Sequence, residues 1–184
     1  MITALAGGVG AARFLQGLVQ VLPEGEKLTV VVNTGDDMVL HSLHISPDLD
    51  IITYTLAGIV DVEKGWGINE DTFRCLEGLR NLGLDEWFRL GDKDLATHIY
   101  RTELLRAGVP LSEVTKTICG RLNIRSRILP MTDDKFETWI RTDAGWVHFE
   151  EYYVRWGCRD EVRDVQFRGA ESARPSPGVI EALE

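Results

Sequence analysis

The chain has 184 residues, a length that suits one domain with a substantial core, and 44% hydrophobic and 27% charged residues are typical of a globular protein. The net charge of −9 argues against a broad nucleic-acid-binding surface, because such surfaces need lysine and arginine to neutralise phosphates. No apolar run of about eighteen residues and no signal-peptide pattern is present, so we expect a cytoplasmic protein that does not enter the membrane.

The N-terminal part predicts a strand, a glycine turn, a helix and a second strand. Residues 2–6 form a short apolar run that ends in GGVG, and residues 11–22 carry apolar side chains with a helical period until Pro23 and Gly25. The continuous apolar run Leu28–Val32 is typical of a buried parallel strand. This order is the opening of a Rossmann-like, doubly wound sheet.

The remaining residues predict further helices, strands and a β-hairpin. Residues 33–50 are polar and turn-rich, and residues 51–60 favour a helix or mixed structure over a strand. The elements expected after these are helices over 71–82 and 92–108, a helix with Ser112 as its N-cap, a strand over 125–130, a hairpin over 136–154 that turns at Asp143-Ala144-Gly145, a strand over 161–169 and a helix that opens at Ser176-Pro177.

The predicted fold is therefore a single α/β domain over residues 1–184. It has a mostly parallel, Rossmann-like doubly wound sheet, helices on both faces and a β-hairpin insertion. Because the last helix has barely begun when the chain stops, we expect a C-terminal part of this domain to be missing.

The glycine turn is the first predicted binding site. Gly7, Gly8 and Gly10 allow a close approach of the backbone to a ligand, and the helix that begins near Ala11 directs free N–H groups toward it. The turn lacks the Gly-Lys-Ser/Thr ending of an ATP-binding P-loop, so Arg13 is a nearby source of positive charge. A nucleotide diphosphate is the expected ligand, and a plain strand-to-helix turn is the alternative.

Four aspartates follow the second strand, at the edge where open α/β sheets bind ligands. They are Asp36, Asp37, Asp48 and Asp50. Carboxylate oxygens suit a hard divalent cation such as Mg²⁺, whose coordination a substrate phosphate can complete. The alternative is that these aspartates only cap turns.

Histidines and aromatic residues on predicted loops allow two interpretations each. His41 and His44 can join the aspartates in a transition-metal site, or they can pack against the loop or a ligand. The ring of Trp66 can stack on a flat heterocycle or pack helices together.

The order of several motifs resembles that of one protein family. The motifs are GGVGAARFLQGL, VVNTGDD, LHISPDLDI, TLAG, GWGINEDTF, WFRLGDKDLATH, LPMTDD and HFEEYYVRW. Over essentially the whole chain they resemble the CofD family, the 2-phospho-L-lactate transferases of coenzyme F420 biosynthesis. The resemblance implies a Mg²⁺-dependent enzyme. It would move a phospholactyl or phosphoenolpyruvyl group from a guanosine diphosphate-linked donor to the ribityl hydroxyl of the deazaflavin Fo, with GMP as the second product.

The resemblance and the chemistry of the residues together predict individual roles. Catalysis is assigned to Asp36, Asp37 and Asp50, and magnesium ligation to Asp36, Asp37 and Asp48. The expected substrate-binding residues are Asp50, Arg89, His44, Ser46, Trp66 and Thr72. The expected nucleotide-binding residues are Gly7, Gly8, Gly10, Ala11, Arg13, Asn33, Thr34, Thr132 and Asp133, the last because a carboxylate suits the donor edge of guanine. A homodimer is the expected assembly.

Two other functions stay open. The YvcK-like gluconeogenesis factors share the glycine-rich start, so a non-catalytic regulator that binds a nucleotide or nucleotide-sugar is the alternative. The second possibility is an inactive fragment. Family members are longer, and they continue with a parallel strand and a Pro-Ser-Asn-Pro turn that helps form the nucleotide pocket. The residues do not distinguish a lactyl donor from an enolpyruvyl donor.

Overall fold

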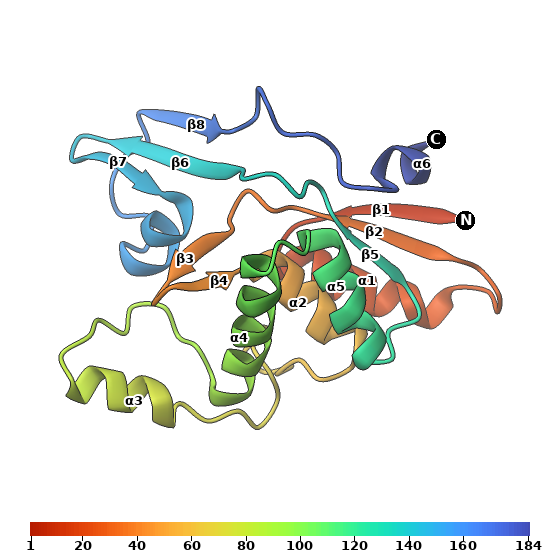
Figure 1. Cartoon of the computed structure of the whole chain (residues 1–184), viewed down its shortest axis with the longest axis horizontal. Coiled ribbons are helices and arrows are strands. Elements are labelled where there is room, and N and C mark those ends of the chain that lie inside the picture. Colours follow the sequence, from red (N-terminus) through yellow and green to blue (C-terminus); the bar gives the residue numbers. More distant parts are fainter.

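The computed structural model describes all 184 residues and contains a three-stranded parallel sheet of order β1-β2-β5 (Figure 1). Its strands are β1 (Ile2–Ala6), β2 (Leu28–Val32) and β5 (Arg127–Pro130). Ala6 pairs with Val32, and Val32 pairs with Pro130. The three strands therefore end at one edge of the sheet, and the segments that follow them start close together.

Helices cover both faces of this sheet, as the sequence predicts. The elements on one face are α1 (Val9–Val21), α2 (Pro47–Leu56) and α5 (Leu111–Arg121), and α6 (Val179–Leu183) lies on the other. Val30 and Val32 pack toward α1, α2 and α5, whereas Val31 packs with Val179 and Ala182 of α6. Successive side chains of a strand point to opposite faces, so β2 is apolar on both and completely buried.

Two smaller sheets complete the fold. β3 (Met38–Leu40) and β4 (Leu43–Ile45) form a hairpin, and β6 (Glu137–Thr142), β7 (Gly145–His148) and β8 (Asp164–Arg168) form an antiparallel sheet of order β7-β6-β8. The other elements are α3 (Arg74–Asn81), α4 (Asp92–Arg106) and the π-helical turn η1 (Glu151–Arg155) after β7. The predicted hairpin insertion is confirmed. None of the helices combines the length and the apolarity needed to cross a membrane.

The segment 33–50 is more ordered than its polar composition indicates. It contains the β3–β4 hairpin and the beginning of α2, which has Ser46 as its N-cap and Pro47 in its first turn. Asp48 and Asp50 therefore lie on a helix and not on a loop, and both are buried. The first turn of a helix fixes the direction in which each of the two side chains points, whereas a loop would not.

Two predicted helix starts are wrong. Ser112 is not an N-cap, because Pro110 precedes the helix and Ser112 lies in its first turn, where Asp133 accepts its N–H at 2.6 Å and its hydroxyl at 2.8 Å. The last helix begins at Val179 and not at Ser176-Pro177, since the hydroxyl of Ser176 instead donates to the carbonyl of Pro130 at 2.5 Å. In both cases a partner distant in sequence decides what the serine does.

Candidate active site

Asn33 joins two of the predicted metal ligands at the carboxyl end of β2. Its Nδ2 donates to Asp36 Oδ2 at 3.2 Å and to Asp48 Oδ2 at 3.0 Å. Its Oδ1 accepts the backbone N–H of Gly35 at 2.9 Å, which fixes the orientation of the amide. One amide group thus holds the two carboxylates side by side.

The carboxylate of Asp48 lies against the glycine turn. A Cβ atom added to Gly7 would lie 3.3 Å from Asp48 Oδ2, and one added to Gly8 would lie 3.1 Å from Oδ1. Helix α1 begins at Val9, and no side chain caps it, so the free N–H groups of its first turn stay available for an anion. The site therefore combines the positive end of a helix dipole with a buried carboxylate.

Asp37 faces a different set of partners. Its Oδ2 accepts a hydrogen bond from the hydroxyl of Ser46 at 2.8 Å and lies 2.9 Å from His44 Nε2, whereas its Oδ1 is buried without a partner. Asp36, Asp37 and Asp48 do not bring three ligand oxygens within 4.8 Å of one another. Of the three aspartates predicted to ligate magnesium, Asp36 and Asp48 are held together by Asn33, whereas Asp37 has Ser46 and His44 as its partners. The metal role of all three stays a prediction.

Asp36 and Asp48 fit a Mg²⁺ ion whose remaining coordination positions a substrate phosphate and water would fill. Mg²⁺ is often held by one or two carboxylates together with substrate phosphates and water. Both side chains are at least partly withdrawn from water, and no lysine or arginine pairs with either of them. The two side chains are thus of a type and placement that a hard divalent cation could use as ligands.

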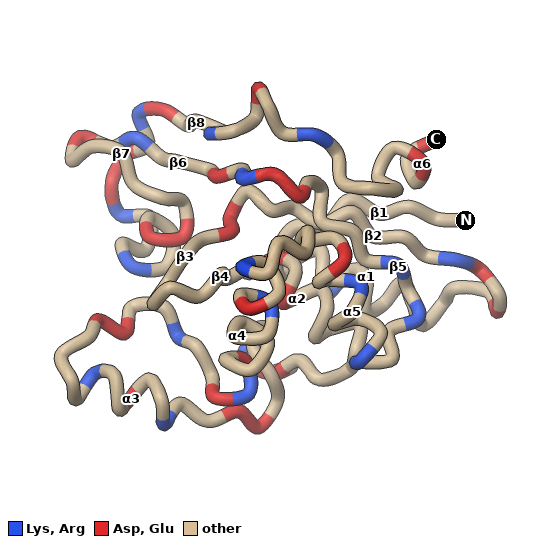
Figure 2. The backbone as a smooth tube through the Cα atoms, in the orientation of Figure 1, with Lys and Arg blue, Asp and Glu red and all other residues tan.

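Glu150 brings another carboxylate to this cluster, and the sequence analysis missed it. Burial, followed by repulsion from Asp36 and Asp48, raises the pKa of Glu150 to about 8. Burial, followed by repulsion from Asp48 and Asp37, raises the pKa of Asp36 to about 7. Figure 2 shows acidic residues on the tube just before β3. The motif HFEEYYVRW contains Glu150, but nothing local to that motif places it near residue 36.

Gly35 allows the antiparallel sheet to approach the cluster. The N–H of Thr138 on β6 donates to the Gly35 carbonyl at 2.6 Å. A Cβ at Gly35 would lie 2.8 Å from Thr138 Oγ1 and 3.0 Å from the Phe136 ring. Any side chain at residue 35 would therefore crowd the side chains of Thr138 and Phe136 and the amide of Asn33.

Asp50 is already neutralised by a basic side chain. The guanidinium of Arg101 on α4 donates to both of its oxygens, and His98 Nδ1 lies 3.6 Å away. His98 Nε2 lies 3.2 Å from Asp94 Oδ1, which also accepts the hydroxyl of Tyr54 at 2.6 Å. Asp50, Asp94 and His98 offer three ligand atoms within 4.8 Å, but a metal ion there would compete with the guanidinium. A direct catalytic or substrate-binding role for Asp50 would require this ion pair to rearrange.

Three other predicted substrate-binding residues, Trp66, Thr72 and Arg89, lie on the segment between α2 and α4. The guanidinium of Arg89 stacks on the ring of Phe73, 4.4 Å from its centroid. The hydroxyl of Thr72 donates to Asp92 at 2.5 Å, and Trp66 lines a small pocket with Phe73. Arg89, Thr72 and Trp66 thus contact residues near the segment between α2 and α4, and none of these contacts reaches the carboxylates of Asp36, Asp37 or Asp48.

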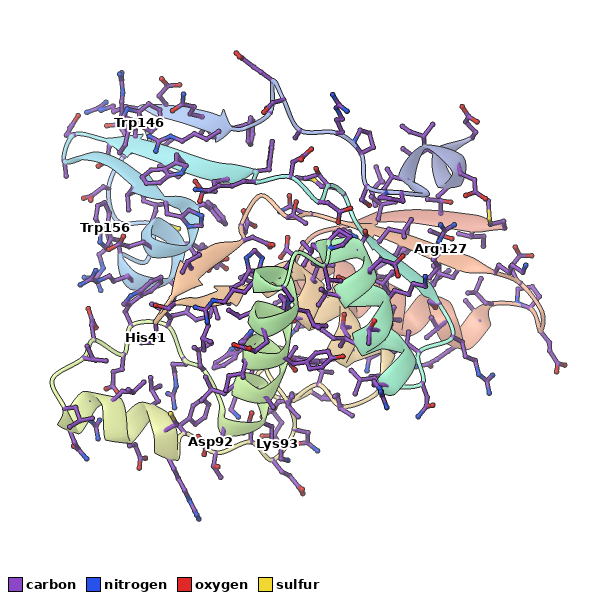
Figure 3. The ribbon with its side chains drawn as sticks, in the orientation of Figure 1. His41, Asp92, Lys93, Arg127, Trp146 and Trp156 are labelled. Atoms are coloured by element: carbon purple, nitrogen blue, oxygen red, sulfur yellow. The ribbon has the colours of Figure 1, made fainter.

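Thr72 belongs to a pair of reciprocal helix caps. Asp92, labelled with Lys93 at the start of α4 in Figure 3, accepts the N–H of Cys75 at 3.0 Å in the first turn of α3. Asp71 accepts the N–H of Lys93 at 2.8 Å in the first turn of α4. The motifs GWGINEDTF and WFRLGDKDLATH are thus linked by their acidic residues, each of which caps the helix of the other.

Removal of one cap should cost measurable stability. We expect Asp71→Ala to lower the free energy of unfolding by about 1 kcal/mol, because the N–H groups at the start of α4 lose their acceptor. Asp85→Ala removes an exposed aspartate that pairs only with Arg155 and should cost less than about 0.5 kcal/mol. Urea unfolding followed by circular dichroism measures both, and equal effects would contradict the capping role.

The turn predicted to recognise guanine makes hydrogen bonds within the protein, and its role toward a nucleotide stays a prediction. Asp133 uses both oxygens on Ser112, as described above. The hydroxyl of Thr132 donates to the carbonyl of Arg174 at 2.6 Å and accepts the N–H of Asp134 at 3.0 Å. These contacts explain the residues without a nucleotide, and a base bound here would have to break or share them.

The remaining predicted residues separate into buried and exposed groups. Thr34 is 3% exposed, has a hydroxyl without a partner and lines a cavity of about 300 Å³ together with Asp37 and His44. Arg13 is exposed, and its guanidinium lies beside Gly65. His41 lies at the exposed turn of the β3–β4 hairpin (Figure 3), so His44 and not His41 contacts the aspartates.

A parallel sheet whose strand ends present a glycine turn, a helix N-terminus and clustered carboxylates defines a protein of the Rossmann-like α/β class. The family described as "2-phospho-L-lactate transferase CofD" matches residues 2–184, and the chain belongs to this family.

Several curated relatives are named phosphoenolpyruvate transferase. The one from Streptomyces griseus is 46% identical over 187 residues and the one from Thermobifida fusca is 43% identical over 195 residues. These alignments cover 99% and 100% of this chain, but 58% and 61% of the relatives. The chain thus spans a little over half the length of the curated relatives it matches.

A solved structure has the same fold. It is a member of the UPF0052 family from Bacillus halodurans, with a TM-score of 0.59 and 16% identity, and the match covers 98% of this chain and 55% of that one.

Proposed function

We propose that this chain carries the phosphate-binding and catalytic carboxylates of a transferase of coenzyme F420 biosynthesis. The reaction moves a phosphoenolpyruvyl or phospholactyl group from a guanosine diphosphate-linked donor to the terminal ribityl hydroxyl of Fo, and GMP is released. The observation that carries this proposal is that Asn33 holds Asp36 beside Asp48 and that Asp48 lies against the glycine turn, in a chain that matches the CofD family from residue 2 to residue 184.

The phosphoenolpyruvyl donor is the one we favour. Relatives between 43% and 47% identical to this chain are named phosphoenolpyruvate transferases. Donor choice belongs to the whole protein, so a comparison of the two donors is part of the test.

In this proposal, different residues bind the phosphates, hold the metal ion and position the carboxylates. The N–H groups at the start of α1 bind the donor's phosphates, and Asp36 and Asp48 hold Mg²⁺. When bound, Mg²⁺ neutralises the charge of the diphosphate during transfer. Asn33 keeps both carboxylates in place. Transfer of this kind needs positioning and charge neutralisation more than a covalent nucleophile.

Asp37 is our proposal for the proton acceptor. In the transfer, the ribityl oxygen forms a bond to the phosphorus that bears the enolpyruvyl or lactyl group, and the bond from that phosphorus to the departing GMP oxygen breaks. The hydroxyl proton moves to the carboxylate. Asp37 suits this role because Ser46 and His44 orient one oxygen and leave the other, Oδ1, without a partner.

The test is a transfer assay with Fo, Mg²⁺ and either donor. We expect Asp36→Asn and Asp37→Asn each to lower the rate by about 100-fold or more, because each removes a charge that acts on the reacting groups. Glu24→Gln, which removes an exposed carboxylate, should keep the wild-type rate. Binding of GDP without transfer under any condition would contradict the proposal and favour the regulatory alternative.

A further inference from the structure

Helix α4 supplies hydrogen-bond partners for the outer edge of the β3–β4 hairpin, against which it lies (Figure 1). β4 pairs with β3 alone, so its other edge presents backbone groups that need partners. The N–H of His44 donates to Thr102 Oγ1 at 2.8 Å, and the His44 carbonyl accepts a longer hydrogen bond from Arg101 Nη1 at 3.5 Å. Both backbone groups of His44 are thus bound by α4.

The hydroxyl of Thr102 has a fixed orientation on the helix. It donates to the carbonyl of His98, one turn earlier, at 2.6 Å, and the residue is 5% exposed. A hydroxyl has one proton to donate, so this bond directs the remaining lone pairs of the oxygen to other donors. The His44 N–H uses one of them, and the position of the His44 backbone is therefore set by the helix.

The side chain of His44 carries this constraint to Asp37. Its Nε2 lies 2.9 Å from Asp37 Oδ2, and Asp37 is 8% exposed. Thr102 is therefore linked to the carboxylate through the backbone and the ring of one residue. A shift of the His44 backbone would move the ring and would change the orientation of the Asp37 carboxylate.

We propose that Thr102 is a positioning residue for the transfer reaction: from α4 it fixes the backbone of His44, whose ring keeps Asp37 in the orientation in which it accepts the hydroxyl proton. This inference rests on Asp37 as the proton acceptor of the proposed function. Thr102 acts through His44 and not by contact with the reacting atoms.

The test uses variants that change the Thr102 hydroxyl. Thr102→Val keeps the shape of the side chain but removes the acceptor of the His44 N–H, whereas Thr102→Ser keeps the hydroxyl. Thr117→Val is the matched control, because the Thr117 hydroxyl on α5 makes the same kind of bond, to the carbonyl of Glu113 at 2.8 Å, away from the hairpin. The transfer assay gives kcat and KM, hydrogen exchange reports on the His44 N–H, and thermal melts verify that each variant is folded.

Thr102→Val should lower kcat by about 10-fold or more and leave KM for both substrates nearly unchanged, because a misplaced catalytic group slows the chemical step without weakening binding. The His44 N–H should exchange faster in this variant, since it has lost its acceptor. Thr102→Ser should restore both values, and Thr117→Val should keep those of the wild type.

A folded Thr102→Val variant with the wild-type kcat would overturn the positioning role, as would a loss of kcat that Thr102→Ser does not restore. If Asp37→Asn loses activity while Thr102→Val does not, the proposed proton acceptor stands and the positioning role alone is wrong. If Asp37→Asn keeps the wild-type rate, the proton acceptor of the proposed function is wrong and the role of Thr102 is overturned with it.

Discussion

Arg101→Met should lower the free energy of unfolding by about 3–5 kcal/mol, the largest effect that we expect from a single substitution in this protein. The Arg101 side chain is 3% exposed and that of Asp50 is 9% exposed. Burial acts against the charged guanidinium, but the charge and hydrogen bonds of Asp50 outweigh it and raise the pKa of Arg101. Removal of the arginine would leave a buried carboxylate with His98 as its remaining nearby basic group.

Two further variants separate the ion pair from simple loss of packing. The double variant Asp50→Asn/Arg101→Met should be more stable than Arg101→Met alone, because it does not contain an unpaired buried charge. Arg106→Met, on the same helix, removes a side chain that is 58% exposed and should cost less than about 0.5 kcal/mol. Chemical unfolding curves measure these three variants together with Asp50→Asn alone. A double variant as unstable as the sum of Asp50→Asn and Arg101→Met would show that the pair contributes through packing only.

The second large effect is a loss of stability with rising pH in the absence of metal. The pKa of Glu150 in the folded protein is raised from 4.5 to about 8, and that of Asp36 from 3.8 to about 7. The folded protein therefore binds more protons than the unfolded chain between these values. The two groups stabilise the folded protein fully at a pH below their unfolded-state pKa values. This stabilisation is lost as the pH rises through about 7 for Asp36 and about 8 for Glu150.

We expect the free energy of unfolding in EDTA to fall by about 3–6 kcal/mol between pH 5 and pH 8.5, since each group contributes about 1.4 kcal/mol per pH unit between its unfolded and its folded pKa. Glu150→Gln should flatten this dependence, because it removes one of the two groups. Glu151→Gln, a change at the next residue, which pairs with Arg155, should leave the slope unchanged. Melts across this pH range with and without Mg²⁺ complete the experiment. If Asp36 and Asp48 hold the ion, Mg²⁺ should stabilise the protein most at high pH, and an equal slope in wild type and Glu150→Gln would contradict the assignment.

The opening of the fold followed from local sequence. Apolar runs of five residues, a glycine turn and a helical period specify a strand, a turn, a helix and a strand without reference to distant residues, and this order predicts a parallel sheet. Because parallel strands end at one edge, the glycine turn after β1 and the segment after β2 were expected to start close together, and the pairing of Ala6 with Val32 places them so. Family membership was equally readable, since it rests on the order of motifs along the chain.

The partners of each side chain were decided only by tertiary structure. Asp36, Asp37, Asp48 and Asp50 look equivalent in the sequence, yet Asn33 holds two of them, Ser46 and His44 hold the third and Arg101 neutralises the fourth. Glu150 joins them from more than 100 residues away. Periodicity and composition report which faces are apolar, whereas a carboxylate's role depends on which donor or charge lies within a few ångströms of it, and that is set by how distant elements pack.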